Sequence, residues 1–229
     1  MALNFSLDSL LEQSLLTEDP WWVYILNGAW WTIGLTIAAF ALALLIGIIV
    51  GTLRTAPNKF VRGLCEAWIE LFRNIPLIVQ IFIWYFVVPE LVPWYKDWLI
   101  EVDPAVGQFV TAFICMGLFT SSRIAEQVRA GISSLPRGLP NAAKALGFTT
   151  VQAYVQVVLP MAMRLIVPPL TSESMNLVKN TAVAMTIGLP ELTMRANEMG
   201  ENTFTFFAAY LWATILYIII ALVVNQLMA

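Results

Sequence analysis

The feature that most constrains this chain is a long stretch without a charged side chain, which runs from Asn27 to Leu53. A helix of about 20 apolar residues crosses a bilayer, so this stretch is long enough to span one. Hydrophobic residues make up 59% of the chain, charged residues only 12%, and the mean hydropathy is +0.78. These values depart strongly from those of globular proteins and predict an all-α integral membrane protein.

Further apolar stretches predict five transmembrane helices, which we place at residues 27–53, 63–88, 108–131, 165–189 and 205–227. They form one transmembrane domain, residues 25–229. An interfacial segment, residues 1–24, precedes it. Within that segment, leucines recur at helical spacing over residues 3–20, opposite Asp and Glu, which predicts an amphipathic helix ended by Pro20.

Glycines in the first span and a proline in the second are expected to affect how these helices pack and where they break. Gly34, Gly47 and Gly51 offer small surfaces on the first span, and the Gly47-xxx-Gly51 spacing favours close packing of a neighbouring helix. In the second span, Pro76 is expected to weaken or break the helix and to free backbone carbonyl groups.

Basic residues gather in two connections between the predicted spans. Arg54, Lys59 and Arg62 follow the first span. Four more surround the connection between the third and fourth spans: Arg129, Arg137, Lys144 and Arg164. Because cytoplasmic loops are enriched in lysine and arginine, we expect the amino terminus outside and the carboxyl terminus in the cytoplasm. The connections 89–107 and 190–202, which are mostly acidic, are expected to be outside loops.

Missing residue types exclude several kinds of chemistry. The chain has no histidine, which removes the common zinc motifs and every serine–histidine or cysteine–histidine catalytic pair. Cys65 and Cys115 lie in apolar stretches and are interpreted as packing thiols. No phosphate loop of the Gly-x-x-x-x-Gly-Lys-Ser/Thr type occurs. The sequence therefore predicts no catalytic residue and no metal site. It also predicts no nucleic-acid partner and no cleavable signal peptide.

Several charged residues fall inside predicted spans, where insertion costs about 2.5–3.5 kcal/mol each. One interpretation is internal pairing, of Glu70 with Arg73, of Arg123 with Glu126, and of Glu173 with a partner on another helix. The other is a hydrophilic path between the second, third and fourth spans. The candidate path residues are Arg73, Asn74, Gln80, Arg123, Glu126, Ser172, Glu173, Asn176, Lys179 and Asn180.

The fourth span carries the most polar face. Five of the candidates, from Ser172 to Asn180, occupy an arc of about 120° at 100° per residue, which should face protein or water. Arg73 and Lys179 are candidate contacts for a substrate carboxylate.

A polar stretch from Asn141 to Pro160 interrupts the apolar sequence. It predicts a short helix over 141–146 that turns at Gly147, and a second helix capped by Thr149 or Thr150 that reaches Leu159-Pro160.

These residues resemble a known family. Ala142-Ala143-x-x-x-Gly147 followed by Val158-Leu159-Pro160 resembles the "EAA" loop of permease subunits of bacterial ABC importers. The segments 70–80, 126–132 and 177–181 resemble the polar amino acid subfamily, and most of all the permeases of glutamate/aspartate importers. The resemblance covers nearly all of the chain from the first span to the fifth.

The resemblance implies an assembly in the bacterial cytoplasmic (inner) membrane. Two permease subunits, identical or related, would form the pathway, in contact with membrane lipid. Two ATPase subunits would bind ATP and Mg²⁺ and hydrolyse the ATP, and this chain would bind no cofactor. A periplasmic or lipid-anchored binding protein would deliver the amino acid. The ATPases would clasp a coupling loop made of Asn141, Ala142, Ala143, Gly147, Leu159 and Pro160.

The sequence departs from the family pattern at three places. Asn141 stands where the motif has an acidic residue, Ala182 follows Asn180-Thr181 where serine is frequent, and the basic carboxyl-terminal tail is missing, as in a truncated chain.

Two other classes of function share some of these features. An ion-coupled secondary transporter could use Glu126 and Glu173 to relay protons or Na⁺, although the chain is short and lacks inverted repeats. A membrane-embedded enzyme fits less well, because the chain has no histidine and no paired-aspartate signature.

Overall fold

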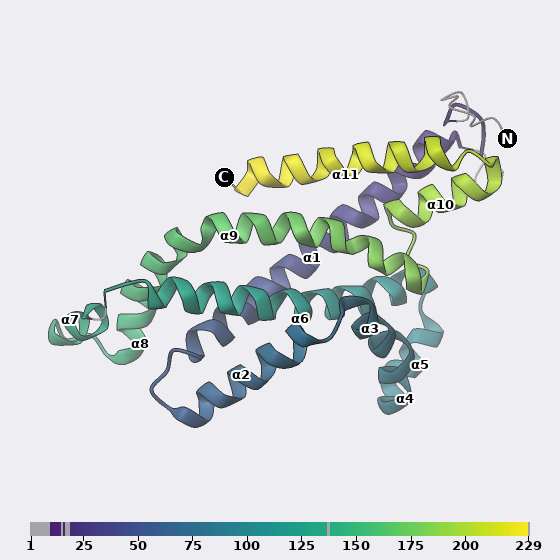
Figure 1. Cartoon of the computed structure of the whole chain (residues 1–229). Helices are drawn as coiled ribbons and strands as arrows, with labels where there is room; N and C mark the ends of the chain where they lie inside the picture. The colour runs from purple at the N-terminus through teal and green to yellow at the C-terminus, as the bar shows by residue number, and fades with distance from the viewer. Residues whose placement is uncertain (1–9, 15, 17–18, 137, 229) are drawn as a thin grey trace.

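The computed structural model describes residues 10–14, 16, 19–136 and 138–228. These residues are helical, with no strand among them beyond a single isolated bridge between Gln13 and Pro20. Four long helices form the bundle: α1 (Trp21–Leu53), α6 (Pro104–Ser133), α9 (Leu159–Asn180) and α11 (Phe206–Met228). In Figure 1, α6 and α9 lie side by side while α1 crosses behind them.

The most extensive helix contact in the described bundle is between α1 and α6. A Cβ atom added at Gly47 would lie 2.6 Å from the Ile124 side chain, and one added at Gly51 would lie 2.5 Å from the Ala125 carbonyl oxygen. The predicted close packing at these glycines is therefore confirmed. Gly34 has only an ordinary contact, 3.9 Å from Phe109.

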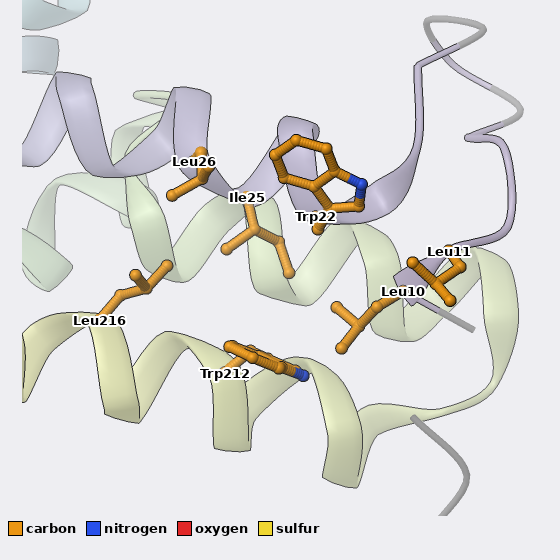
Figure 2. A pocket seen from close by; sticks show the side chains of 7 residues that line it. All are labelled: Leu10, Leu11, Trp22, Ile25, Leu26, Trp212 and Leu216. Carbon is orange, nitrogen blue, oxygen red and sulfur yellow. The ribbon is translucent and has the colours of Figure 1, made fainter. Parts of the chain in front are cut away.

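The segment before α1 differs from the prediction. Its described residues, 10–14, 16 and 19–20, form a turn and the Gln13–Pro20 bridge, so the amphipathic helix predicted over 3–20 is wrong for them, and residues 3–9 lie outside the described part. Leu10 is buried and anchors this segment on the bundle. Figure 2 shows the apolar pocket of about 460 Å³ beside this contact. It is lined by Leu10, Leu11, Trp22, Ile25, Leu26, Trp212 and Leu216.

The second span is broken. Helix α2 (Lys59–Asn74) is followed by α3 (Leu77–Phe82), a π-helical turn (Ile83–Val87) and α4 (Val88–Leu91), and the two halves meet at 98°. The break at Pro76 is as predicted, and the bent pair begins at Lys59 and ends at Leu91, a few residues outside the predicted bounds of 63–88. The chain has four helices long and apolar enough to cross a membrane within the described residues, or five if this bent pair counts as one span.

Both connections predicted as outside loops contain helices. They are α5 (Pro93–Glu101) and α10 (Leu192–Thr203). A proline begins α5 in its first turn, and the Glu191 carboxylate caps α10 by accepting hydrogen bonds from the backbone of Thr193 and Met194.

The polar stretch also continues as helix beyond its predicted end. Helices α7 (Leu139–Ala145) and α8 (Thr150–Ala153) lead through a π-helical turn (Tyr154–Val158) into α9, which passes into a 3₁₀ segment, η4 (Thr181–Ile187). Leu159-Pro160 therefore begins α9 and does not end a helix. Pro160 directly follows the π-helical turn, where the regular i→i−4 hydrogen bonds of an α-helix are already interrupted, so the missing N–H group of proline costs little there.

Replacing Gly51 by alanine is expected to lower the free energy of unfolding by about 1–3 kcal/mol, because the added methyl group overpacks the α1–α6 contact. Gly63→Ala is the control, since nothing lies within 4 Å of a Cβ at Gly63. Thermal unfolding of the purified proteins, followed by tryptophan fluorescence, measures the difference. Equal melting temperatures for the two variants would contradict the close contact.

Candidate functional site

The predicted path residues fall into separate clusters. Glu126, on α6, is the centre of the first, which we call the Glu126 cluster. Its carboxylate is ion-paired with Arg54 after α1, accepts a hydrogen bond from Arg129 Nε at 3.0 Å, and lies 3.9 Å from Arg73 Nη1. Glu66 Oε1 joins the cluster at 2.9 Å from Arg54 Nη2. The cluster ties the middle and the last turn of α2 to the end of α1 and to α6.

This pairing corrects two of the predicted ion pairs. Glu126 pairs with Arg54, Arg129 and Arg73 and not with Arg123. No ion pair joins Glu70 to Arg73 in the part of the chain that the structure describes. Arg54 is the partner that sequence reasoning missed, because a loop residue near α1 reaches α6 only through the tertiary fold.

The second cluster joins α6 to α9. Arg123 Nη1 lies 3.3 Å from Glu173 Oε1, so the partner expected for Glu173 on another helix is Arg123. The Arg123 guanidinium also lies over the Phe119 ring, 5.2 Å from its centre. Glu173 is buried, whereas the Arg123 side chain is 44% exposed. Burial with a charged partner makes Glu173 primarily a packing element of this face.

The remaining polar residues of α9 point out of the subunit. Ser172 and Lys179 are exposed, and Asn176 and Asn180 are half-buried. Among the described residues, none forms an ion pair with Lys179. A lysine charge without a partner on a membrane-spanning helix requires water or another polar surface. This exposed stripe is therefore the part of the chain best suited to line a polar path.

Two predicted path residues lie at the elbow between α2 and α3. Gln80 is buried, and its side-chain amide nitrogen donates to the carbonyl oxygens of Phe72 and Ile75, each at 2.8 Å. It thereby satisfies carbonyl groups that the break at Pro76 leaves without helical partners. Asn74, the last residue of α2, is exposed at the elbow.

Four of the six predicted coupling residues lie on α7 and in the turn after it, which project from one end of the bundle (Figure 1). The other two, Leu159 and Pro160, begin α9. Gly147 has a φ of +91°, and the backbone N–H groups of Gly147 and Phe148 donate to the carbonyls of Lys144 and Ala143. This is a Schellman turn, in which a residue with a side chain would be strained. Thr149 then caps α8 with Gln152, as predicted.

The surface of this projection is partly apolar. Ala143 is buried against the subunit, whereas Asn141, Ala142 and Gly147 are exposed. Sequence reasoning did not single out Leu146 and Val151, which are 81% and 72% exposed. Two large apolar side chains on a short helical projection form a surface suited to a protein partner.

Glu191 is a second residue that the sequence did not single out. It was placed in an outside loop, yet its side chain is fully buried and accepts a hydrogen bond from the Tyr217 hydroxyl at 2.7 Å. Burial raises the pKa of this carboxyl group above its ordinary value, while its hydrogen bonds act in the opposite direction. Its hydrogen bonds join the start of α10 to α11.

Comparison with known proteins identifies the family. Residues 43–229 match the family of inner membrane components of binding-protein-dependent transport systems, so the chain belongs to that family. It is 44% identical, over 96% of its length and 90% of the relative's, to the glutamate/aspartate import permease protein GltJ of Escherichia coli K12. It is 28% identical to the glutamate/aspartate import permease protein GltK of Escherichia coli O6:H1, covering 90% and 91% of the two chains.

The fold agrees with solved relatives. A crystal structure of an amino acid ABC transporter with histidines aligns with a TM-score of 0.74 and 25% identity, covering 90% of this chain and 91% of that one.

Replacing Glu126 by glutamine is expected to lower the free energy of unfolding by about 1–3 kcal/mol, between the values for exposed and buried ion pairs. The variant loses one of the two carboxylates paired with Arg54 and the carboxylate paired with Arg129. The matched control is Glu90→Gln, which removes a pair with Lys96 whose Glu90 side chain is 63% exposed. Thermal unfolding in low and high salt measures both. If the Glu126 variant lost no more free energy of unfolding than the control, Glu126 would not be the residue that holds the cluster together.

Proposed function

We propose that this chain is the permease subunit of an ABC importer that moves acidic L-amino acids, glutamate and aspartate, across the bacterial cytoplasmic membrane. The observation that carries the proposal is the 44% identity to a glutamate/aspartate import permease over 96% of the chain. The unpaired Lys179 on the exposed stripe of α9 gives the acidic specificity a physical basis, since a cation in a path of low dielectric favours a carboxylate.

The proposed assembly contains two permease subunits, two ATPase subunits and a periplasmic or lipid-anchored binding protein. The second permease is a related chain, as the existence of two different permease proteins named for glutamate/aspartate import suggests. ATP and Mg²⁺ are bound by the ATPase subunits, which hydrolyse the ATP, and this chain binds no cofactor. The Ser172–Asn180 stripe faces the other permease across the pathway.

The proposed orientation places the amino terminus outside and the carboxyl terminus in the cytoplasm. It is supported by the charge distribution, because the basic connection after α1 lies at the same end of the bundle as α7 and α8 (Figure 1). At that end, α7 receives force from the ATPase. It transmits the force to α9 through α8 and the π-helical turn, which form one helical run with α9 from Thr150 to Ile187.

Ion-coupled transport fits the structure less well. The carboxylates it would use, Glu126 and Glu173, are both ion-paired with arginine, so neither offers an unpartnered carboxylate to a transported ion. The family assignment also favours transport driven by a partner ATPase.

Replacing Gly147 by glutamate is expected to abolish ATP-dependent uptake, while membrane insertion stays normal, because the strained turn and added charge disrupt the partner surface of α7. Gly63→Glu is the control, since Gly63 is also exposed in open space but lies on α2. Uptake by vesicles that contain the complete transporter, with co-purification of the ATPase, provides the measurement. Normal uptake by the Gly147 variant would contradict the coupling role.

Replacing Lys179 by glutamine is expected to raise the KM for glutamate about tenfold, the equivalent of about 1.4 kcal/mol, because the path loses its unpaired cation. Lys96→Gln, at an exposed ion pair on α5, is the matched control. Competition of glutamate uptake by aspartate, glutamine, arginine and histidine tests specificity in the same vesicles. Stronger competition by arginine or histidine than by aspartate would overturn the acidic-substrate proposal.

A further inference from the structure

A polar pocket lies beside the Glu126 cluster, at the end of the bundle that carries the basic connection. It has a volume of about 350 Å³ and is lined by Arg54, Thr55, Ala56, Arg62, Glu66, Arg129 and Ser133. Three of its lining residues are arginines, contributed by the turn after α1, by α2 and by the last turns of α6. We propose that this pocket binds the phosphate of an anionic phospholipid headgroup.

The charge of the pocket fits a phosphodiester. Arg54 and Arg129 are paired with the carboxylates Glu66 and Glu126, whereas Arg62 is exposed and has no ion-pair partner among the described residues. With Arg73, which lies 3.9 Å from Glu126, four guanidinium groups stand against two carboxylates, so the surroundings of the pocket carry a net positive charge. The single negative charge of a phosphodiester is favoured beside that excess.

The donors are held in place before a ligand arrives. Glu126 binds Arg54 and Arg129 Nε, which positions both guanidinium groups and leaves the terminal nitrogens of Arg129 available to donate. The Arg54 side chain is only 16% exposed and the Arg129 side chain 41% exposed. Preorganised arginines lose little side-chain entropy on binding and match the fork geometry of a phosphate group.

The position of the pocket selects a lipid as the source of the phosphate. Leu53 ends α1 and Ser133 ends α6, and both helices are candidate membrane spans, so the pocket lies at the depth of the headgroups. Phe60 and Leu64, on the opposite face of α2 from Arg62, are 73% and 58% exposed, which suits a helix at the hydrocarbon boundary. Basic pockets at the cytoplasmic ends of spans are a recognised kind of headgroup site.

Native mass spectrometry of the complete transporter, titrated with phosphatidylglycerol or phosphatidylcholine, tests the proposal. The wild type is expected to bind phosphatidylglycerol more tightly than phosphatidylcholine. Arg62→Gln should weaken phosphatidylglycerol binding about fivefold and Arg62→Glu about thirtyfold, at about 1 kcal/mol per charge near the membrane surface. Arg62 is exposed and unpaired, so both variants should fold. Lys96→Gln and Lys96→Glu, at the exposed pair on α5, are the matched controls and should leave binding unchanged.

Four results would overturn the proposal. The first is wild-type affinity in both Arg62 variants, and the second is equal binding of the two lipids. The third is release of phosphatidylglycerol by millimolar inorganic phosphate, which would assign the pocket to a soluble anion. The fourth is binding only after the ATPase subunits are removed, which would show that an acidic surface of the partner covers the pocket in the working transporter.

Discussion

The rest of this structure depends on the close approach of α1 and α6. Their backbones meet where Gly47 and Gly51 face Ile124 and Ala125, and no side chain larger than hydrogen fits at those two points. In a bilayer, helices gain little from burying apolar surface, so close packing and polar contacts decide which helices associate. Once α1 and α6 are in contact, Arg54 at the end of α1 can reach Glu126 on α6, and the Glu126 cluster forms.

The structure also depends on the elbow between α2 and α3. Pro76 forces the chain out of helix, because it lacks an N–H group and restricts Ile75 to an extended conformation. In hydrocarbon the freed carbonyl groups would be costly, and the Gln80 amide donates to two of them. A glutamine that looks like a path residue in the sequence therefore donates hydrogen bonds to the backbone, whereas Ser172 and Lys179 on α9 stay exposed.

The candidate sites were predictable to different degrees. The Schellman turn at Gly147 and the cap at Thr149 follow from local rules, and both were predicted. The partners of Glu126 were not. Arg129 stands three residues from Glu126 on α6, as Arg123 does, and spacing alone does not choose between them, whereas Arg54 comes within reach of Glu126 only through the fold. The apolar surface at Leu146 and Val151 could have been found from two large hydrophobic residues flanking a polar turn.

The sequence by itself determined the membrane class, the approximate spans, the break at Pro76 and the family, since hydrophobic length, proline and short motifs act locally or over one helix. Only the tertiary structure decided which charges pair. It also set the angle of the break at 98° and buried Glu191, which the sequence placed in an outside loop. The reason is physical. A local pattern specifies a helix and its ends, but ion pairs and burial depend on which helices approach each other in three dimensions, and here the glycine contact between α1 and α6 governs that approach.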